Sequence, residues 1–382
     1  MIAASPSDPG VRVHLATSLD GLGGVLQEKG DTTGALENRR KGLAIRQELA
    51  KLDPNNSHYR RQLAFSHHNV GLSLVEAGEL ASALGQFRQE LRMFEALSTA
   101  DPKDVQGRRN RSLAHKQIGD VLMRTRDVRG ALAQYRAALD IDRDLASADP
   151  DNSQAVLDLS FSESKIGSAL AKLGEIESAL VILRSGVDRH ESLVAKDPHH
   201  ILLYNHLANS YTRIANCLLD NRDTKAAVEY FRKAVGARLA FSEKSPNSST
   251  NRRALAECYI NLGKALFATN REDALKQYTN AIEMLEHLTA TDRTNARYRI
   301  ALADALSSTA GVYVRAATQD GESEMRLYDW TEARSFYQRS QELWLELSRT
   351  SKIPAARVGE TQKVSTELAR CDQSLAKLHS IK

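Results

Sequence analysis

The sequence has few of the residues that usually define a disulfide-rich domain or a membrane protein. Aromatic residues make up 5% of its 382 residues, and it contains 8 prolines and 3 cysteines. The cysteines show no C-x-x-C spacing, which excludes a disulfide scaffold, and unpaired cysteines predict a cytoplasmic location. No run of about 18 apolar residues occurs, so a membrane-spanning chain is excluded as well.

An excess of charge of one sign is also lacking. The 52 basic and 48 acidic residues leave a formal net charge of +4, which by itself indicates neither a nucleic-acid partner nor an anionic membrane. The sequence has no Walker, H-E-x-x-H, G-x-S-x-G or kinase signature. We therefore predict a protein that is not an enzyme and that carries no cofactor and no metal ion.

What the sequence does have is a repeat of 48 residues. Six prolines lie at this interval, namely Pro6, Pro54, Pro102, Pro150, Pro198 and Pro246. A small residue, here called the anchor, follows the same interval and appears a last time one position early, because a residue is lost near Arg271. The anchors are Gly23, Gly71, Gly119, Gly167, Ala215, Gly263 and Ala310. Such periodicity is typical of stacked helical units.

Each 48-residue repeat has the pattern of a hairpin of two helices. The recurring positions −8, −7, −4, −1, 0 and +3 relative to the anchor lie on one face of a first helix. Fifteen residues before the anchor, six of seven residues are good N-cap types. These are Asp8, Asn56, Asp104, Asn152, Ser248 and Asn295, with His200 as the exception. A glycine such as Gly30, Gly78 or Gly174, or a substitute, ends the first helix, and an acidic residue begins the second.

The pattern resembles the tetratricopeptide repeat. Two units match best, with a small residue, a leucine three positions later, and then alanine, an aromatic residue and alanine. They contain Gly119, Leu122, Ala131, Tyr135 and Ala138, and Ala215, Leu218, Ala227, Phe231 and Ala234. The family's usual repeat has about 34 residues, and we interpret the surplus as one heptad added to each helix.

The resemblance implies an all-α fold, a right-handed superhelical solenoid of helix hairpins. We expect seven repeats at about 5–52, 53–100, 101–148, 149–196, 197–244, 245–291 and 292–350, and a capping helix at 351–382. The last repeat carries an 11-residue insertion around Thr318–Asp329. The capping helix has a single narrow apolar face, as a terminal cap needs. This apolar stripe consists of Val364, Leu368, Cys371, Leu375 and Leu378.

The first repeat has no matching cap. Either the chain is a fragment of a longer protein, or its first helix has an exposed apolar flank. We favour a fragment or a short open reading frame.

The resemblance also implies a function, namely a non-catalytic scaffold that binds a peptide or a partner domain in a concave groove of first helices. By family geometry the groove includes positions −6, −3, +1 and +5. Its candidate residues are Phe65, His68, Leu72, Leu113, Lys116, Asp120, Phe161, Lys172, Asn209, Thr212, Asn216 and Lys264. The apolar members either contact a ligand or pack against a neighbouring helix, and the sequence leaves both open.

Two other functions stay open. Long repeats that begin with Asp-Pro resemble the tails of some bacterial serine/threonine kinases, so the first alternative is a regulatory tail of a larger signalling protein. The second is a nucleic-acid-binding helical repeat protein, because arginine recurs at position −11, as Arg12, Arg60, Arg108, Arg252 and Arg299. We favour the simpler interpretation that these arginines lie on the core and form ion pairs.

His67, His115 and Glu163 share position −4 in successive repeats. They are either a row of metal donors or polar side chains at a packing position that hydrogen-bond within the protein. We favour hydrogen bonding.

Overall fold

The computed structural model describes residues 8–319, 322–350, 353 and 357–379, and over these ranges the regular secondary structure is helical. The α-helices are α1 (Pro9–Glu28), α2 (Thr32–Leu52), α3 (Ser57–Ala77), α4 (Leu80–Ala100), α5 (Val105–Arg124), α6 (Val128–Ala148), α7 (Ser153–Lys172), α8 (Ile176–Lys196), α9 (Ile201–Asp220), α10 (Thr224–Lys244), α11 (Ser249–Leu266), α12 (Arg271–Thr291), α13 (Ala296–Ala317), α14 (Ser323–Arg349) and α15 (Glu360–His379). The predicted all-α class is confirmed.

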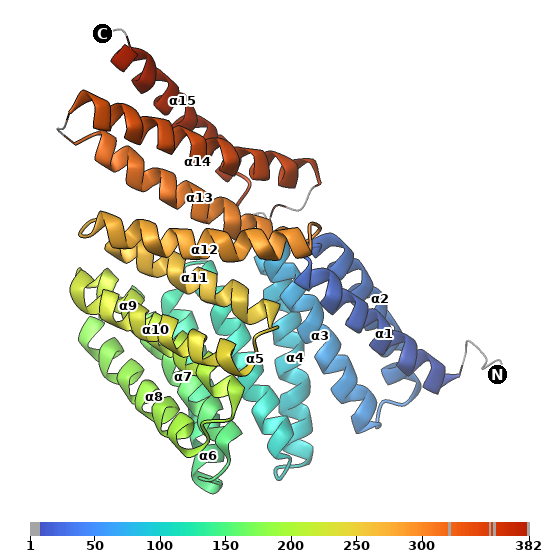
Figure 1. Cartoon of the computed structure of the whole chain (residues 1–382). Helices are drawn as coiled ribbons and strands as arrows, with labels where there is room; N and C mark the ends of the chain where they lie inside the picture. Colours follow the sequence, from blue (N-terminus) through green and yellow to red (C-terminus); the bar gives the residue numbers. More distant parts are fainter. Residues whose placement is uncertain (1–7, 320–321, 351–352, 354–356, 380–382) are drawn as a thin grey trace. The chain divides into compact units, whose positions relative to one another are not determined.

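The chain divides into two compact units, Met1–Leu193 and Val194–Lys382. In the first unit α1 packs on α2, α3 on α4 and α5 on α6, and successive hairpins also pack on each other. In the second unit the pairs are α9 with α10, α11 with α12 and α13 with α14, and α15 lies along α14 (Figure 1). The predicted order of sequential helix hairpins is therefore confirmed within each unit.

The first helices begin where the N-cap residues predict. The side chains of all six N-cap candidates accept a hydrogen bond from a backbone N–H in the first turn, whereas His200 makes no such bond. At Asp8, for example, Oδ1 lies 2.7 Å from the amide nitrogen of Gly10. Each such cap stabilises its helix by about 0.5–2 kcal/mol.

The turns of five hairpins, from α1–α2 to α9–α10, each contain a residue in the left-handed region. Gly30, Gly78 and Gly174 have φ of 78°, 81° and 83°. The predicted substitutes for glycine are arginines, since Arg126 and Arg222 have φ of 67° and 63°. Glycine adopts this conformation without the steric cost that a Cβ brings, so these two turns keep the geometry at some loss of stability.

The anchors are small because a side chain of the second helix fills the space beside them. A Cβ placed on Gly71 would lie 2.6 Å from Cε1 of Phe87, and one on Gly263 would lie 2.9 Å from Cε1 of Tyr278. Both rings are almost completely buried. The two helices of a hairpin thus approach closely at these anchors because an aromatic ring lies against the glycine, whereas Gly167 meets Leu183 and Gly23 meets Arg39.

Each unit has a core that crosses hairpin boundaries. In the first unit Leu36 and Leu43 of α2 share a buried cluster with Val70 and Leu74 of α3 and Ile118 of α5. In the second unit, a buried cluster on α13 and α14 is joined by the whole predicted stripe of α15. The stripe thus covers α14 with apolar side chains while the rest of α15 stays largely exposed.

The insertion in the last repeat forms more helix than expected. We predicted extra residues between two helices, but α14 begins at Ser323 and is 27 residues long. Most of the insertion therefore extends α14 at its N-terminus. Asp329 and Trp330 are buried there, and Arg271 of α12 forms an ion pair with Asp329.

None of the helices in the described ranges has the length and apolar character that crossing a membrane requires.

Candidate functional site

The candidate groove residues fall into two groups because the chain divides at Leu193. The first group lies on α3, α5 and α7 of the first unit, and the second on α9 and α11 of the second unit. The first group is Phe65, His68, Leu72, Leu113, Lys116, Asp120, Phe161 and Lys172. The second group is Asn209, Thr212, Asn216 and Lys264.

The four apolar candidates differ in exposure. Phe65 is half-buried and packs edge-on against Phe94, with 5.5 Å between ring centroids. Leu72 is half-buried against the core cluster of the first unit, and Leu113 is also half-buried. Phe161 is 37% exposed, the most of the four. The structure thus assigns packing to Phe65 and Leu72 and leaves Phe161 partly exposed.

Phe161 is held in a set of charged side chains from α5 and α7. Nζ of Lys165 lies 5.0 Å from the ring centroid and Nζ of Lys116 lies 5.6 Å from it, distances typical of cation–π contacts. Lys165 is also 2.7 Å from both carboxylate oxygens of Asp120, and the Tyr135 hydroxyl donates to Asp120 at 2.6 Å. We call these five residues the Phe161 platform.

The Lys116 side chain lies in the interior of the protein and not at its surface. Its side chain is 4% exposed, and Nζ lies 2.7 Å from Oδ2 of Asp142, whose side chain is fully buried. The Ser162 hydroxyl donates to the same oxygen at 2.6 Å. Lys116 and Asp142 belong to α5 and α6 of the same hairpin, and Ser162 belongs to α7, so the hydrogen bond from Ser162 ties this ion pair to the next hairpin.

His68 is also turned toward its own hairpin. Its Nδ1 lies 3.1 Å from Oε1 of Glu90 on α4, and Glu90 is 1% exposed. Burial raises the pKa of the Glu90 carboxyl above its ordinary value, and the hydrogen bond from His68 opposes that rise. A ligand at this position would meet a side chain already engaged in a buried contact.

In the second unit, Asn209 forms a polar contact with a buried arginine. Nη2 of Arg238, on α10, donates to Oδ1 of Asn209 at 2.8 Å, and burial lowers the pKa of the Arg238 guanidinium. Thr212 donates to the carbonyl of Ala208 at 2.9 Å. Asn216 and Lys264 are exposed on α9 and α11. Three of the four candidates here present polar groups at the surface, since Asn209 is exposed as well.

The sequence reasoning missed a set of buried polar residues on the second helices. Arg46, Asp142 and Arg238 lie at the same position of their repeats, 23 residues after the anchor. Arg46 pairs with Asp20 of its own hairpin and donates to the Ser66 hydroxyl of the next at 2.8 Å. The signal was available, because a charged residue recurs at one position of a helix whose other faces are already assigned.

The three residues that share position −4 make contacts within the protein. Nδ1 of His67 lies 2.7 Å from Oε1 of Gln86, and His115 contacts Gln134 in the same way at 2.8 Å. Glu163 forms an ion pair with Arg189. Among the described residues no cluster of three or more His, Cys, Asp or Glu is placed to hold a metal ion.

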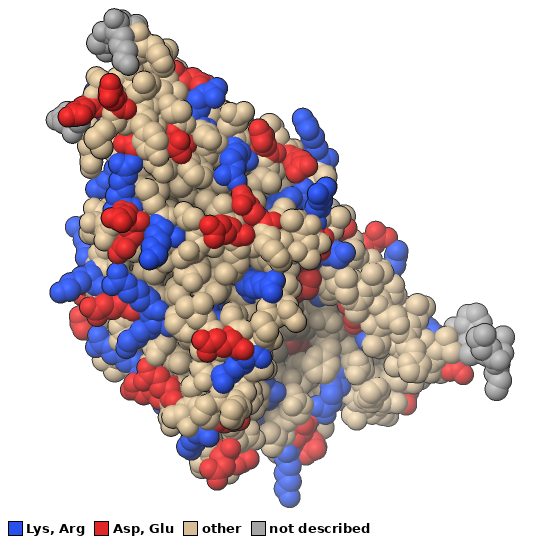
Figure 2. Space-filling model, in the orientation of Figure 1, with Lys and Arg blue, Asp and Glu red and all other residues tan. Residues whose placement is uncertain are grey.

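The arginines at position −11 have partners of several kinds. Arg108 forms an ion pair with Asp144 at 3.4 Å and Arg299 one with Glu346 at 3.5 Å. Arg252 donates through Nη2 to the carbonyl of Pro246 at 2.7 Å. Basic and acidic side chains also alternate over the face of the molecule in Figure 2, without a large area of one sign.

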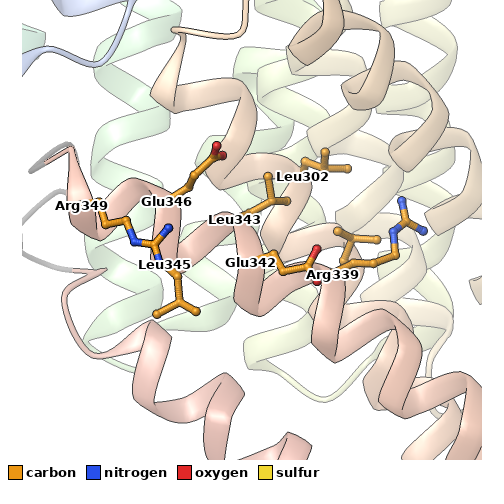
Figure 3. Close-up of a pocket in the computed structure, with 8 residues that line it drawn as sticks. Leu302, Arg339, Glu342, Leu343, Leu345, Glu346 and Arg349 are labelled. Carbon is orange, nitrogen blue, oxygen red and sulfur yellow. The ribbon is translucent and has the colours of Figure 1, made fainter.

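Two surface cavities lie in the second unit, away from the candidate residues. One, of about 490 Å³, lies on α13 and α14, where leucines alternate with charged side chains of both signs (Figure 3). The other, of about 590 Å³, lies on α10, α11 and α12 and is lined in part by Leu239, Tyr259 and Met284. Neither cavity includes a candidate groove residue.

Comparison with known proteins agrees with the fold. Residues 208–240 match the model of the tetratricopeptide repeat family. The crystal structure of BtubC (BKLC) from P. vanneervenii is 16% identical over 70% of this chain and 92% of that chain, with a TM-score of 0.52. The apo form of RapI is 12% identical over 87% of this chain and 99% of that chain, with a TM-score of 0.50. A comparison with curated proteins gives no match.

At these identities the likeness shows the fold, which is an all-α arrangement of helix hairpins of the tetratricopeptide type.

Proposed function

We propose that this chain is a non-catalytic protein-interaction scaffold whose first helices bind a peptide or a segment of a partner protein. The observation that carries the proposal is the Phe161 platform, an aromatic ring that is 37% exposed and is fixed between charged side chains of two neighbouring hairpins. In this proposal the hairpins are tetratricopeptide-like repeats of 48 residues, and the longer helices give each first helix a longer ligand-binding face.

The platform suits a ligand with one apolar side chain among polar ones. The ring offers apolar area, while Lys165 and Asp120 form a polar rim that is tied to the Tyr135 hydroxyl. Because Lys165 is already paired, its side chain loses little conformational freedom when a ligand arrives. A rigid aromatic residue surrounded by polar groups is the usual composition of an interface hot spot.

The test is a selection of random phage-displayed peptides on the wild-type chain, followed by calorimetry on the selected peptides. Phe161→Ala should weaken binding by about tenfold to a hundredfold, as hot-spot truncations do. Leu52→Ala is the matched control, since Leu52 is 66% exposed on α2 of the same unit. Circular dichroism checks that both variants stay folded.

Two results would contradict the proposal. One is the absence of any enriched peptide, and the other is a set of peptides that bind wild-type and Phe161→Ala chains equally well.

A further inference from the structure

The two surface cavities of the second unit occupy the same place in successive repeats. Each is lined by positions −8 and −4 of a first helix and by two adjacent residues of the second helix that follows. In the larger, here called the α12 cavity, these are Leu255, Tyr259, Glu283 and Met284. In the smaller, here called the α14 cavity (Figure 3), they are Leu302, Leu306, Glu342 and Leu343. The same surface feature therefore occurs twice, one repeat apart.

These cavities lie on a different side of the first helices from the candidate groove. At 3.6 residues per turn, positions −8 and −4 fall on the side roughly opposite to positions −6, −3, +1 and +5. Both cavities are bordered by second helices, α12 in one and α14 in the other. A ligand here would therefore occupy a surface separate from the Phe161 platform, which belongs to the first unit.

Position −4 differs in chemistry between the two units. The first unit has His67, His115 and Glu163 there, and each contacts a polar side chain of its own second helix. The second unit has Tyr211, Tyr259 and Leu306. Nζ of Lys233 on α10 lies 5.6 Å from the ring centroid of Tyr211. Tyr259 and Leu306 instead line the cavities, where the described residues make no such polar contact across the apolar base.

The apolar side chains of the cavities extend from the core to the surface. Leu255 and Leu306 are buried, and Met284 is half-buried. Leu239 of α10 and Leu345 of α14 line the α12 and α14 cavities and are 42% and 41% exposed. An apolar side chain of a ligand would therefore continue the core of each hairpin outward and remove exposed leucine surface from water.

The charged groups at the cavities favour a basic ligand. Glu283 and Glu342 are exposed, and neither carboxylate has an ion-pair or hydrogen-bond partner among the described residues. Two of the arginines at the cavities are engaged, since Arg252 donates to a backbone carbonyl and Arg339 forms an ion pair with an acid of α12. Arg349 lies in the last turn of α14, where a cation is favourable beside the helix C-terminus. Each cavity thus combines an apolar base with an unpaired carboxylate.

We propose that α12 and α14 bind a basic amphipathic helix of a partner protein. One apolar side chain of this helix occupies each cavity, and lysine or arginine side chains reach Glu283 and Glu342. A helix suits the surface because it presents apolar and basic side chains in separate stripes, as the cavities present an apolar base beside an acid. Both α12 and α14 pack on α13, so their axes are at most about 20 Å apart. A helix of about 18 residues, about 27 Å long, spans both.

The experiment is a titration of the full chain against a fluorescently labelled amphipathic peptide of about 18 residues that contains leucine and lysine alone. We expect a dissociation constant of about 1–100 μM from fluorescence anisotropy, because the contact area is small. A peptide of the same composition with its leucines distributed around the helix, and an amphipathic peptide of leucine and glutamate, should bind much more weakly. Because the chain has a net charge of +4, its overall charge does not attract the lysine peptide.

Two sets of variants locate the peptide on the cavities. Glu283→Gln/Glu342→Gln should weaken binding by about threefold to thirtyfold, since two exposed ion pairs are lost, whereas Glu229→Gln, on an exposed acid of α10 outside both cavities, should have no effect. Leu239→Ala should weaken binding by about fivefold. Its control is Leu202→Ala, because Leu202 is 56% exposed on α9. Phe161→Ala should leave this binding unchanged.

Four results would overturn the proposal. They are the absence of lysine-peptide binding below millimolar concentration, equal binding of the peptide with distributed leucines, stronger binding of the glutamate peptide, and a glutamine double variant that binds as the wild type does. Circular dichroism checks that each variant keeps its helical content, so a loss of binding is not a loss of fold.

Discussion

Replacing Lys116 by methionine tests whether its buried ion pair with Asp142 stabilises the α5–α6 hairpin and the contact of that hairpin with α7. Methionine has a similar length but no charge, so the variant leaves the Asp142 carboxylate inside the protein without its ion-pair partner. Asp142 is fully buried, and its Oδ1 already lacks a hydrogen-bond partner in the described structure. Only Oδ2 keeps the donated bond from Ser162.

The expected loss of stability follows from leaving the buried Asp142 carboxylate without its ion-pair partner. Removing one partner of a buried ion pair costs about 3–5 kcal/mol, a large part of the roughly 5–15 kcal/mol that stabilises a typical domain. Replacing both partners by apolar residues is far cheaper, because no buried charge remains. We therefore expect Lys116→Met/Asp142→Leu to be within about 1 kcal/mol of the wild type.

The assay is urea unfolding together with hydrogen exchange measured by mass spectrometry. Because repeat proteins are stabilised by contacts between neighbours, Lys116→Met should increase exchange in α5, α6 and α7 and leave α13 to α15 unchanged. A loss below about 1 kcal/mol for Lys116→Met, or a double variant less stable than the single one, would refute the reasoning.

Two further predictions concern packing and pH. Gly71→Ala should destabilise the protein by about 1–3 kcal/mol in urea unfolding because the new methyl group overlaps Phe87. The control Gly85→Ala should be neutral or stabilising, since its methyl group meets no atom within 4 Å. Equal effects of the two substitutions on stability would count against the close contact at Gly71. Burial raises the pKa of Glu90 above its ordinary value of 4.5, so the folded state binds this proton more tightly than the unfolded chain and stability falls as pH rises through the folded-state pKa. Glu90→Gln should reduce the loss of stability between about pH 5 and about pH 8 relative to the exposed control Glu95→Gln, and a pH dependence equal to that of the control would contradict this.

The hairpin architecture was predictable from the sequence because its determinants are local. N-cap residues such as Asn56, the left-handed position of Gly78 and the proline at each joint act within a few residues of the helix ends. The insertion after α13 was placed correctly but predicted as a connection, since nothing in its composition distinguishes a loop from the extra helical turns that Trp330 anchors by burial.

The surface for ligand binding was predictable only in part. The repeat position placed Phe161 and Lys116 alike on the presumed groove, yet one is at the surface and the other is almost completely buried. The difference arises from Asp142, which lies 26 residues after Lys116 on a different helix. Other repeats have arginine, phenylalanine or histidine at this position. The recurrence of charge at this position is visible in the sequence, but the repeat pattern does not show that Asp142 pairs with Lys116, because the two residues lie on different helices.

The sequence by itself thus determined that this chain is a series of helix hairpins and where most of its helices begin and end. These features depend on backbone geometry and on spacing along one helix. Only the tertiary structure decided which charged side chains form contacts that hold the hairpins together. It also decided which aromatic ring and which face of α1 remain exposed. Those properties depend on partners from other helices, and burial and ion pairing are set by the three-dimensional neighbours of a residue and not by its place in the repeat.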